Sequence, residues 1–339
     1  MRLSESIRRD ILETRAEGII NKFKIYKRRN VLLFEEILAN YIKACEDSGY
    51  KEDMNGIAKT WSFLYTKNFL PEFMFKMPKT VLLNRILKKV WINLGLLDDF
   101  KASIKDNTIT FFSHNESITR CIGKNEFCNG LWEGVISGLY GRYAESLSSQ
   151  CSFPDCIYTY SLKDIPFNIE SKSKNHYVNL NKTFAGKGEL QKYLKMKIIV
   201  LKGNHMYFRK KSVVIGENTI FHIFGSKNIL MGKVPDISHL CFSAIIDSES
   251  TVNEKIFLLK NILEVFGWGK VKIIYGGNRI EIEISNPPFG IQKEEDNWTF
   301  FANMILGYIF LINRKASISE INFGKNLKIL YSIRDVFKK

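Results

Sequence analysis

The feature that most constrains the fold of this chain is an order of predicted elements that occurs twice. Within residues 82–162, an apolar pattern at helical spacing precedes a hairpin pattern with an Asp-Asn turn, a second helical pattern and a strand pattern. Residues 258–333 repeat this order, and their hairpin has a Gly-Gly-Asn turn. A collinear order is harder to obtain by chance than any single match, so we interpret the chain as an internal duplication with an offset of about 170 residues. In this register, Gly307 falls opposite Gly138.

The duplication predicts an α+β fold with two tandem helix-rich domains, each with an antiparallel hairpin or sheet. A polar stretch over residues 161–182 is the expected linker, which gives domains at 1–164 and 165–339. Residues 1–75 are expected to be helical, with a charged helix at the start of the chain. Residues 195–226 alternate between Gly-Asn turns and predict an antiparallel sheet in the second domain.

Cysteines cluster in the first predicted domain. Cys121, Cys128, Cys151 and Cys156 lie close together, and the charged first residues predict a helix rather than a secretion signal, so we expect metal ligands before disulfides. Zn²⁺ in structural sites takes four ligands, usually in closely spaced pairs, and Cys151 with Cys156 forms such a pair. The alternative is that these residues are free thiols.

The same region resembles a known family. Residues 127–162, FCNGLWEGVISGLYGRYAESLSSQCSFPDCIYTYSL, resemble the C-terminal half of the 4-vinyl reductase domain, which is related to TRAPP subunits and to haem nitric-oxide sensors. The family pattern is a helix entered through a Cys, a Gly-rich stripe, a Glu-containing strand and two cysteines that close a hairpin. The matching residues are Cys128, Gly134, Gly138, Glu145, Cys151 and Cys156. The resemblance covers residues 82–162, and it reaches 258–333 only through the internal repeat. Its departures are a short Cys151–Cys156 spacing and the lack of a Gly-Asp turn.

The resemblance implies a zinc site and a pocket. Cys128 would be the third zinc ligand, with its thiolate favoured by a helix N-terminus, and Cys121 or Glu145 would be the fourth. Gly134 and Gly138 lie on one helical face, where glycine permits close approach of a helix or a ligand. The expected ligand-binding residues are Gly134, Gly138, Trp132 and Tyr140. The family implies a small, mostly apolar ligand and a sensory or regulatory role without catalysis.

The net charge of +15 favours a second class of function, binding to nucleic acid. An AT-rich genome would also produce this Lys-rich composition. The basic residues that would bind are Lys24, Lys27, Arg28, Arg29, Arg209, Lys210 and Lys211. The absence of long apolar stretches predicts a soluble cytoplasmic protein without a membrane span, which could form a homodimer.

The run Asn286-Pro287-Pro288-Phe289 raises a remote third possibility, an enzyme that methylates amino groups. Such an enzyme also needs a Gly-rich cofactor loop in a parallel sheet, and no stretch of the sequence has that glycine spacing. Two prolines after a strand are explained as a strand end. No pair of histidines lies at helical spacing and no nucleophile motif is present, so we expect no enzyme.

Overall fold

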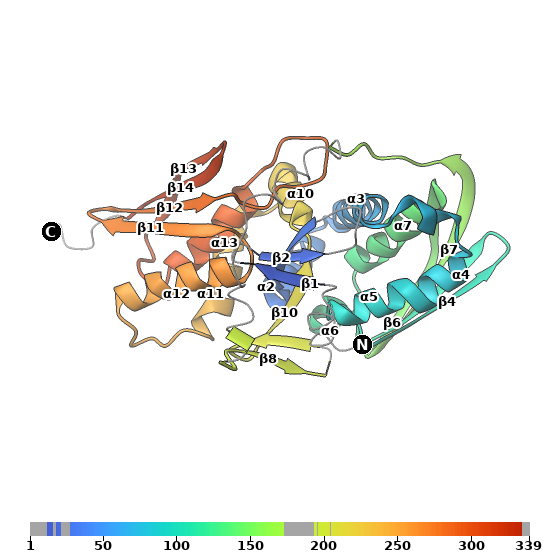
Figure 1. The fold of residues 1–339 in the computed structure, drawn as a ribbon, viewed down its shortest axis with the longest axis horizontal. Helices are drawn as coiled ribbons and strands as arrows, with labels where there is room; N and C mark the ends of the chain where they lie inside the picture. The colour runs from blue at the N-terminus through green and yellow to red at the C-terminus, as the bar shows by residue number, and fades with distance from the viewer. Residues whose placement is uncertain are drawn as a thin grey trace.

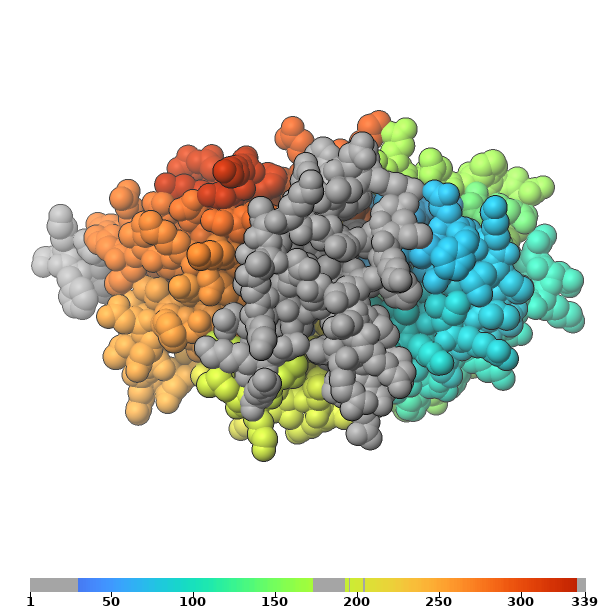
Figure 2. All heavy atoms as spheres, in the orientation of Figure 1, coloured from blue at the N-terminus to red at the C-terminus, as the bar shows by residue number. Residues whose placement is uncertain are grey.

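The structure is a computed structural model that describes residues 12–15, 18–21, 28–172, 193–194, 196–203 and 205–333. It confirms the α+β class, because helices and antiparallel sheets both occur along the described chain. Figure 1 shows a central group of elements with one layered half on either side. In the space-filling view, blue to green residues gather at one end of the molecule and orange to red residues at the other (Figure 2).

A six-stranded antiparallel sheet forms the centre, in the order β1-β2-β3-β10-β9-β8. Its strands are β1 (Leu12–Arg15), β2 (Gly18–Asn21), β3 (Arg28–Phe34), β8 (Ile199–Lys202), β9 (His205–Phe208) and β10 (Lys211–Gly216). The strands expected in the second domain are therefore confirmed. The helical expectation for residues 1–75 is wrong for β1, β2 and β3. The apolar run of β3 is buried on both faces, and such a run cannot be told from a helix by period alone.

The first half places helices against a four-stranded sheet of order β4-β5-β7-β6. Its strands are β4 (Asp99–Lys105), β5 (Thr108–His114), β6 (Arg142–Ser152) and β7 (Asp155–Pro166). Its helices are α2 (Glu35–Asp47), α3 (Lys51–Phe69), α4 (Lys79–Val81), α5 (Lys88–Asn93), α6 (Thr119–Ile122) and α7 (Glu126–Tyr140), with a 3-10 turn η1 (Glu72–Lys76) and a π-helical stretch η2 (Leu82–Leu87) that joins α4 to α5.

The second half has the same strand order, β11-β12-β14-β13. Its strands are β11 (Lys270–Gly276), β12 (Arg279–Ser285), β13 (Ser317–Phe323) and β14 (Asn326–Ser332). Its helices are α10 (Thr219–Lys227), α11 (Val234–Ser243), α12 (Val252–Val265) and α13 (Thr299–Ile309), with a short 3-10 turn η4 (Met231–Lys233). Both predicted hairpins and both predicted helices after them are present. The common origin of the halves stays a prediction.

Glycines set the contact between the paired helices of each half. A Cβ on Gly134 in α7 would overlap Ser62 and the Lys59 carbonyl of α3, and a Cβ on Gly307 in α13 would overlap Ser238 and a carbonyl of α11. Gly134 and Gly307 are also the ninth residues of their helices. The structural partner of Gly307 is therefore Gly134, and the register that placed it opposite Gly138 is wrong by one turn.

One apolar core runs through both halves. The boundary predicted near residue 165 coincides with the end of β7, but β3 from before it pairs with β10 from after it. The core is continuous because this pairing gives the halves a shared central sheet.

Candidate functional site

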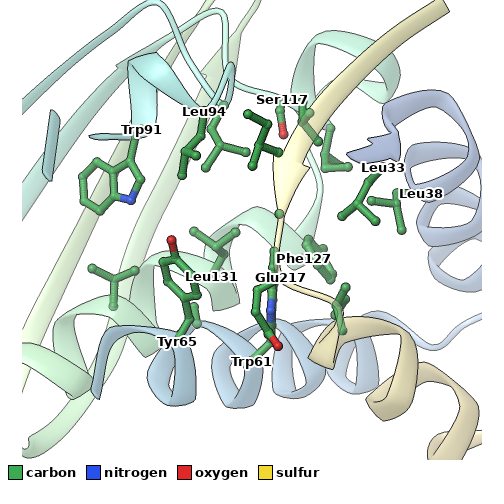
Figure 3. Close-up of a pocket in the computed structure, with 18 of the residues that line it drawn as sticks. Leu33, Leu38, Trp61, Tyr65, Trp91, Leu94, Ser117, Phe127, Leu131 and Glu217 are labelled. Carbon is green, nitrogen blue, oxygen red and sulfur yellow. The ribbon is translucent and has the colours of Figure 1, made fainter. Parts of the chain in front are cut away.

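A cavity lies in the first half between α2, α3, α5, α7 and the central strand β10. Its volume is about 80 Å³. Most of its wall is apolar, and Figure 3 shows side chains from several elements converging on it. On α7 the lining residues are Phe127, Leu131 and Val135, which are spaced four residues apart and therefore share one helical face. Trp91 and Leu94 come from the end of α5.

A few polar groups interrupt this wall. The indole nitrogen Nε1 of Trp61 is buried and has no hydrogen-bond partner among the described residues. Glu217 is 1% exposed, and its carboxylate accepts bonds from the backbone N–H of Thr219 at 3.1 Å and from its hydroxyl at 2.7 Å. Figure 3 shows Trp61 and Glu217 on the same side of the cavity. A pocket of this composition can hold an apolar molecule and orient it through a single polar contact.

Ile118, on the cavity wall, has an unusual backbone conformation. Its φ is 60° and its ψ −61°, and the N–H of Thr119 bonds to the carbonyl of Ser117, as in a γ-turn of the rare, strained form. A β-branched residue with positive φ costs on the order of 1–3 kcal/mol and persists only where its surroundings hold it. The strain therefore lies at the cavity itself.

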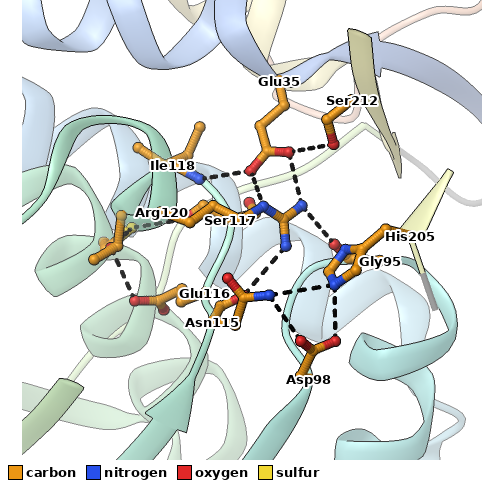
Figure 4. A network of polar contacts seen from close by, with 12 residues as sticks. Glu35, Gly95, Asp98, Asn115, Glu116, Ser117, Ile118, Arg120, His205 and Ser212 are labelled. Carbon is orange, nitrogen blue, oxygen red and sulfur yellow. Dashed lines mark hydrogen bonds and ion pairs between the residues drawn. The ribbon is translucent and has the colours of Figure 1, made fainter. Parts of the chain in front are cut away.

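A buried ion pair holds that turn. Glu35 is fully buried, and its carboxylate receives Nε of Arg120 at 2.7 Å and the backbone N–H of Ile118 at 3.2 Å. Ser212, on β10, donates to the same carboxylate at 2.7 Å. Figure 4 shows that these groups bring together the start of α2, the turn before α6 and the central sheet.

A second contact joins the same loop to β9. Asp98 accepts a bond from the Asn115 side chain at 2.7 Å and lies 2.8 Å from Nε2 of His205 (Figure 4). The loop from Asn115 to Arg120 is therefore fixed to the central sheet at two points.

The corresponding region of the second half is almost closed. It is bounded by α11, α12, α13 and β3, and it leaves only about 10 Å³. Phe221, Phe242 and Phe266 are buried and line the little space that is left. Helices and a strand of the central sheet therefore surround an open cavity in one half and a nearly filled core in the other.

Glu116 connects the cavity loop to the cysteine-containing hairpin. Its buried carboxyl accepts bonds from Trp132 Nε1 and the Tyr158 hydroxyl, both at 2.7 Å, and from the Thr119 hydroxyl at 3.1 Å. Burial raises the pKa of Glu116, although these three donors act in the opposite direction. Sγ of Cys151 lies 3.5 Å from the Tyr158 hydroxyl oxygen.

The predicted zinc ligands are distributed as follows. Cys151 and Cys156 face each other across the β6–β7 hairpin and form a disulfide, with their Cα atoms 4.1 Å apart. Cys128 is buried near Thr119, and Cys121 is exposed. Glu145 binds Lys163 at 2.6 Å, and it lies six residues along β6 from Cys151, or about 20 Å.

This arrangement does not fit a zinc ion as it stands. Two predicted thiolate ligands are joined to each other, and no group of three or more candidate metal ligands occurs in the described parts of the chain. Burial, followed by the nearby Glu116 carboxyl, raises the pKa of Cys128 well above its usual value, and this shift disfavours the thiolate that zinc binding needs. The zinc site stays a prediction that requires a reduced hairpin.

The four predicted ligand-binding residues do not line the cavity. Gly134 and Gly138 face α3. Trp132 is buried in an aromatic cluster with Trp91 and Phe100, and Tyr140 lies near Lys79. The predicted helix is the right element, but its cavity face is the neighbouring stripe of Phe127, Leu131 and Val135.

The Asn-Pro-Pro-Phe run lies in a connection within antiparallel structure. The carbonyl of Pro288 accepts a bond from Asn218 at 2.7 Å, and Phe289 packs with Leu64 and Ile291. Every sheet in the described residues is antiparallel, whereas a methyltransferase of the expected class is built on a parallel sheet. These observations agree with a structural role for the run.

Several of the basic residues are engaged within the molecule. Arg209 donates to the carbonyl of Ile245, and Lys211 pairs with Glu36 at 2.6 Å. Lys24 and Lys27 lie outside the described residues, and for Arg28 and Arg29 only the backbone is described. No helix in the described residues is long and apolar enough to cross a membrane.

Comparison of the sequence with protein-family models and with curated proteins gives no match. The site is therefore interpreted from its own geometry. Sequence reasoning missed Trp61 and Glu217, because each lines the cavity only through packing between segments far apart in the chain. The only hint in the sequence at either residue was the presence of a Trp within the helical pattern of residues 51–69.

Proposed function

We propose that this protein binds one small, mostly apolar molecule per chain in the cavity of the first half, and acts as a sensory or regulatory protein. The main support is the contrast between the two halves. Similar helices and strands surround a cavity of about 80 Å³ in the first half and of about 10 Å³ in the second. Protein interiors are normally close-packed, and an unfilled apolar cavity costs stability. Because the equivalent region of the second half is nearly filled, the open cavity of the first half is best explained as a binding site for a ligand.

The size of the cavity limits the ligand. One water needs about 10–15 Å³ by a comparable measure, so the space corresponds to several waters, or roughly one aromatic ring or a short alkyl chain. An apolar wall favours hydrocarbon over water in such a space. Long-chain lipids are too large for it without rearrangement.

The position of the cavity supports regulation rather than catalysis. Its wall contains Ile118, held by Glu35 and Arg120, and it contains Ile215 and Glu217 from the chain that leads into α10. A ligand would therefore contact a strained turn of one half and a strand that continues into the other half. A ligand that makes better contacts with one arrangement of these elements than with another shifts the conformational equilibrium toward the first.

The other predicted functions receive less support. No observation on the described basic residues favours nucleic acid, and salt-dependent binding to arbitrary DNA or RNA would be its test. The zinc site would be structural and would lie at the β6–β7 hairpin.

The proposal is tested by titration with α-methylstyrene, an uncharged hydrocarbon of about the right size. We expect saturable binding to one site per chain by calorimetry. Val135→Phe places a ring in the cavity and should abolish binding. Val81→Phe makes the same change at an exposed site on α4 and should leave binding intact. Equal loss in both variants, or no binding by the unmodified protein, would overturn the proposal.

A further inference from the structure

We infer that the ligand of the cavity is an uncharged apolar molecule with one hydrogen-bond acceptor, such as a ketone, ether or alcohol oxygen, bound by the indole N–H of Trp61. This inference rests on the proposed function and adds the chemical class of the ligand.

The first argument is the unpaired donor. The Trp indole can only donate, and buried donors in native proteins are nearly always paired. Nε1 of Trp61 is buried without a partner among the described residues, and its side chain lines the cavity. Leaving such a group unpaired costs about 1–3 kcal/mol, which an acceptor on the ligand would recover.

The second argument is that Trp61 is held in position. Its neighbour Ser62 lies against Gly134 in the close contact between α3 and α7, and Ser62 donates to the carbonyl of Lys59 at 3.3 Å. The Trp61 ring also packs near Phe127, with centroids 6.4 Å apart. A donor on a rigid helix pair can select for the position of an acceptor.

The third argument is charge. Among the residues that line the cavity, Glu217 is charged and no Lys or Arg occurs. A ligand carboxylate would lose its hydration without gaining a cation and would be repelled by Glu217. An ammonium group would offer no acceptor to Trp61. The remaining class is neutral.

The second half provides an internal comparison. Ser238 lies against Gly307 as Ser62 lies against Gly134, so Ile237 takes the position of Trp61. The half without an open cavity therefore has no indole at this position.

The experiment compares two probes of nearly equal shape, α-methylstyrene and acetophenone, which differ in a CH₂ or an oxygen at one position. The chain has five Trp residues, and Trp61→Phe identifies the Trp61 indole peak in a ¹H–¹⁵N spectrum. Acetophenone should shift that peak downfield and α-methylstyrene should not. The affinity ratio of acetophenone to α-methylstyrene should fall about 3- to 10-fold in Trp61→Phe. Benzoate should bind at least about 10-fold more weakly than acetophenone.

Trp298→Phe is the matched control, because Trp298 Nε1 is also buried without a partner in the described part of the chain but lies outside the cavity lining. It should leave the ratio unchanged. If both probes bind and Trp61→Phe does not change their ratio, the inference is wrong while the proposed function stands. If neither probe binds, both are wrong. Tighter binding of benzoate than of acetophenone would also overturn the inference.

Discussion

Leu32 and Ile215 lie directly opposite each other in the pairing of β3 with β10, and each donates its backbone N–H to the end of a helix in the opposite half. Leu32 bonds to the carbonyl of Phe266 after α12 at 2.8 Å, and Ile215 bonds to the carbonyl of Leu94 after α5 at 3.2 Å. Each half thus closes its core with a strand from the other. We propose that the two halves descend from one ancestral unit, and this reciprocal exchange supports that proposal.

Tyr160 and Tyr331 allow a test of whether the two halves are structurally equivalent. The Tyr160 hydroxyl bonds to the carbonyl of Asn129 at 3.1 Å, and the Tyr331 hydroxyl bonds to that of Ala302 at 2.9 Å. Asn129 and Ala302 are both the fourth residue of their helices. Each Tyr→Phe change should lower the free energy of unfolding by about 1 kcal/mol, with the larger loss at Tyr160, which also contacts the Asn129 side chain. Urea denaturation measures both. A loss at only one position would contradict equivalent roles.

The Glu35–Arg120 pair should be costly to break from one side. Arg120→Met leaves the Glu35 carboxylate buried without its cation, so the free energy of unfolding should fall by about 3–5 kcal/mol. Adding Glu35→Gln removes the unpaired charge and should restore part of that loss. The double-mutant cycle by chemical denaturation checks the coupling. Additive losses would show that the pair is not coupled.

The elements that could be predicted from sequence are those with a clear period or turn. The β11–β12 hairpin follows from alternating Ile residues around Gly276, Gly277 and Asn278, and α7 follows from its apolar stripe. Strand β13 was missed because its residues are largely exposed and lack an apolar alternation, and β6, which is similarly exposed, was expected only through the resemblance, as the strand that contains Glu145. The residues that line the cavity could not be predicted, since they lie on helices and a strand brought together from both halves.

His222 should make stability dependent on pH. It is fully buried, with Nδ1 2.9 Å from the carbonyl of Asn297 and Nε2 2.9 Å from the Asn218 amide nitrogen, which fits a neutral ring with Nδ1 protonated. Burial lowers the pKa of His222, with Lys172 acting in the same direction and Asp296 opposing it.

A folded-state pKa below the unfolded value means that the stabilisation is present above about pH 6.5 and is lost as the pH falls toward the folded-state pKa. His222→Gln should therefore destabilise the protein most near pH 8 and less near pH 5. Thermal unfolding over this range, with His239→Gln as control, measures the difference. A variant whose destabilisation grows on acidification would contradict the sign of the shift.

The Cys151–Cys156 pair should decide whether the predicted zinc can bind. Cys151, near the end of β6, faces Cys156, near the start of β7, and a disulfide that closes so short a loop stabilises the fold by about 2 kcal/mol through chain entropy. In oxidised protein neither sulfur is available as a thiolate, so we expect no zinc by elemental analysis. After reduction the sequence predicts one zinc per chain, with Cys128 as the third ligand and Cys121 or Glu145 as the fourth. Cys156→Ser should abolish that uptake and Cys241→Ser, at a lone buried cysteine, should not. Zinc retained in the oxidised protein would contradict the Cys151–Cys156 disulfide. If the reduced protein takes up no zinc, the predicted zinc site is wrong.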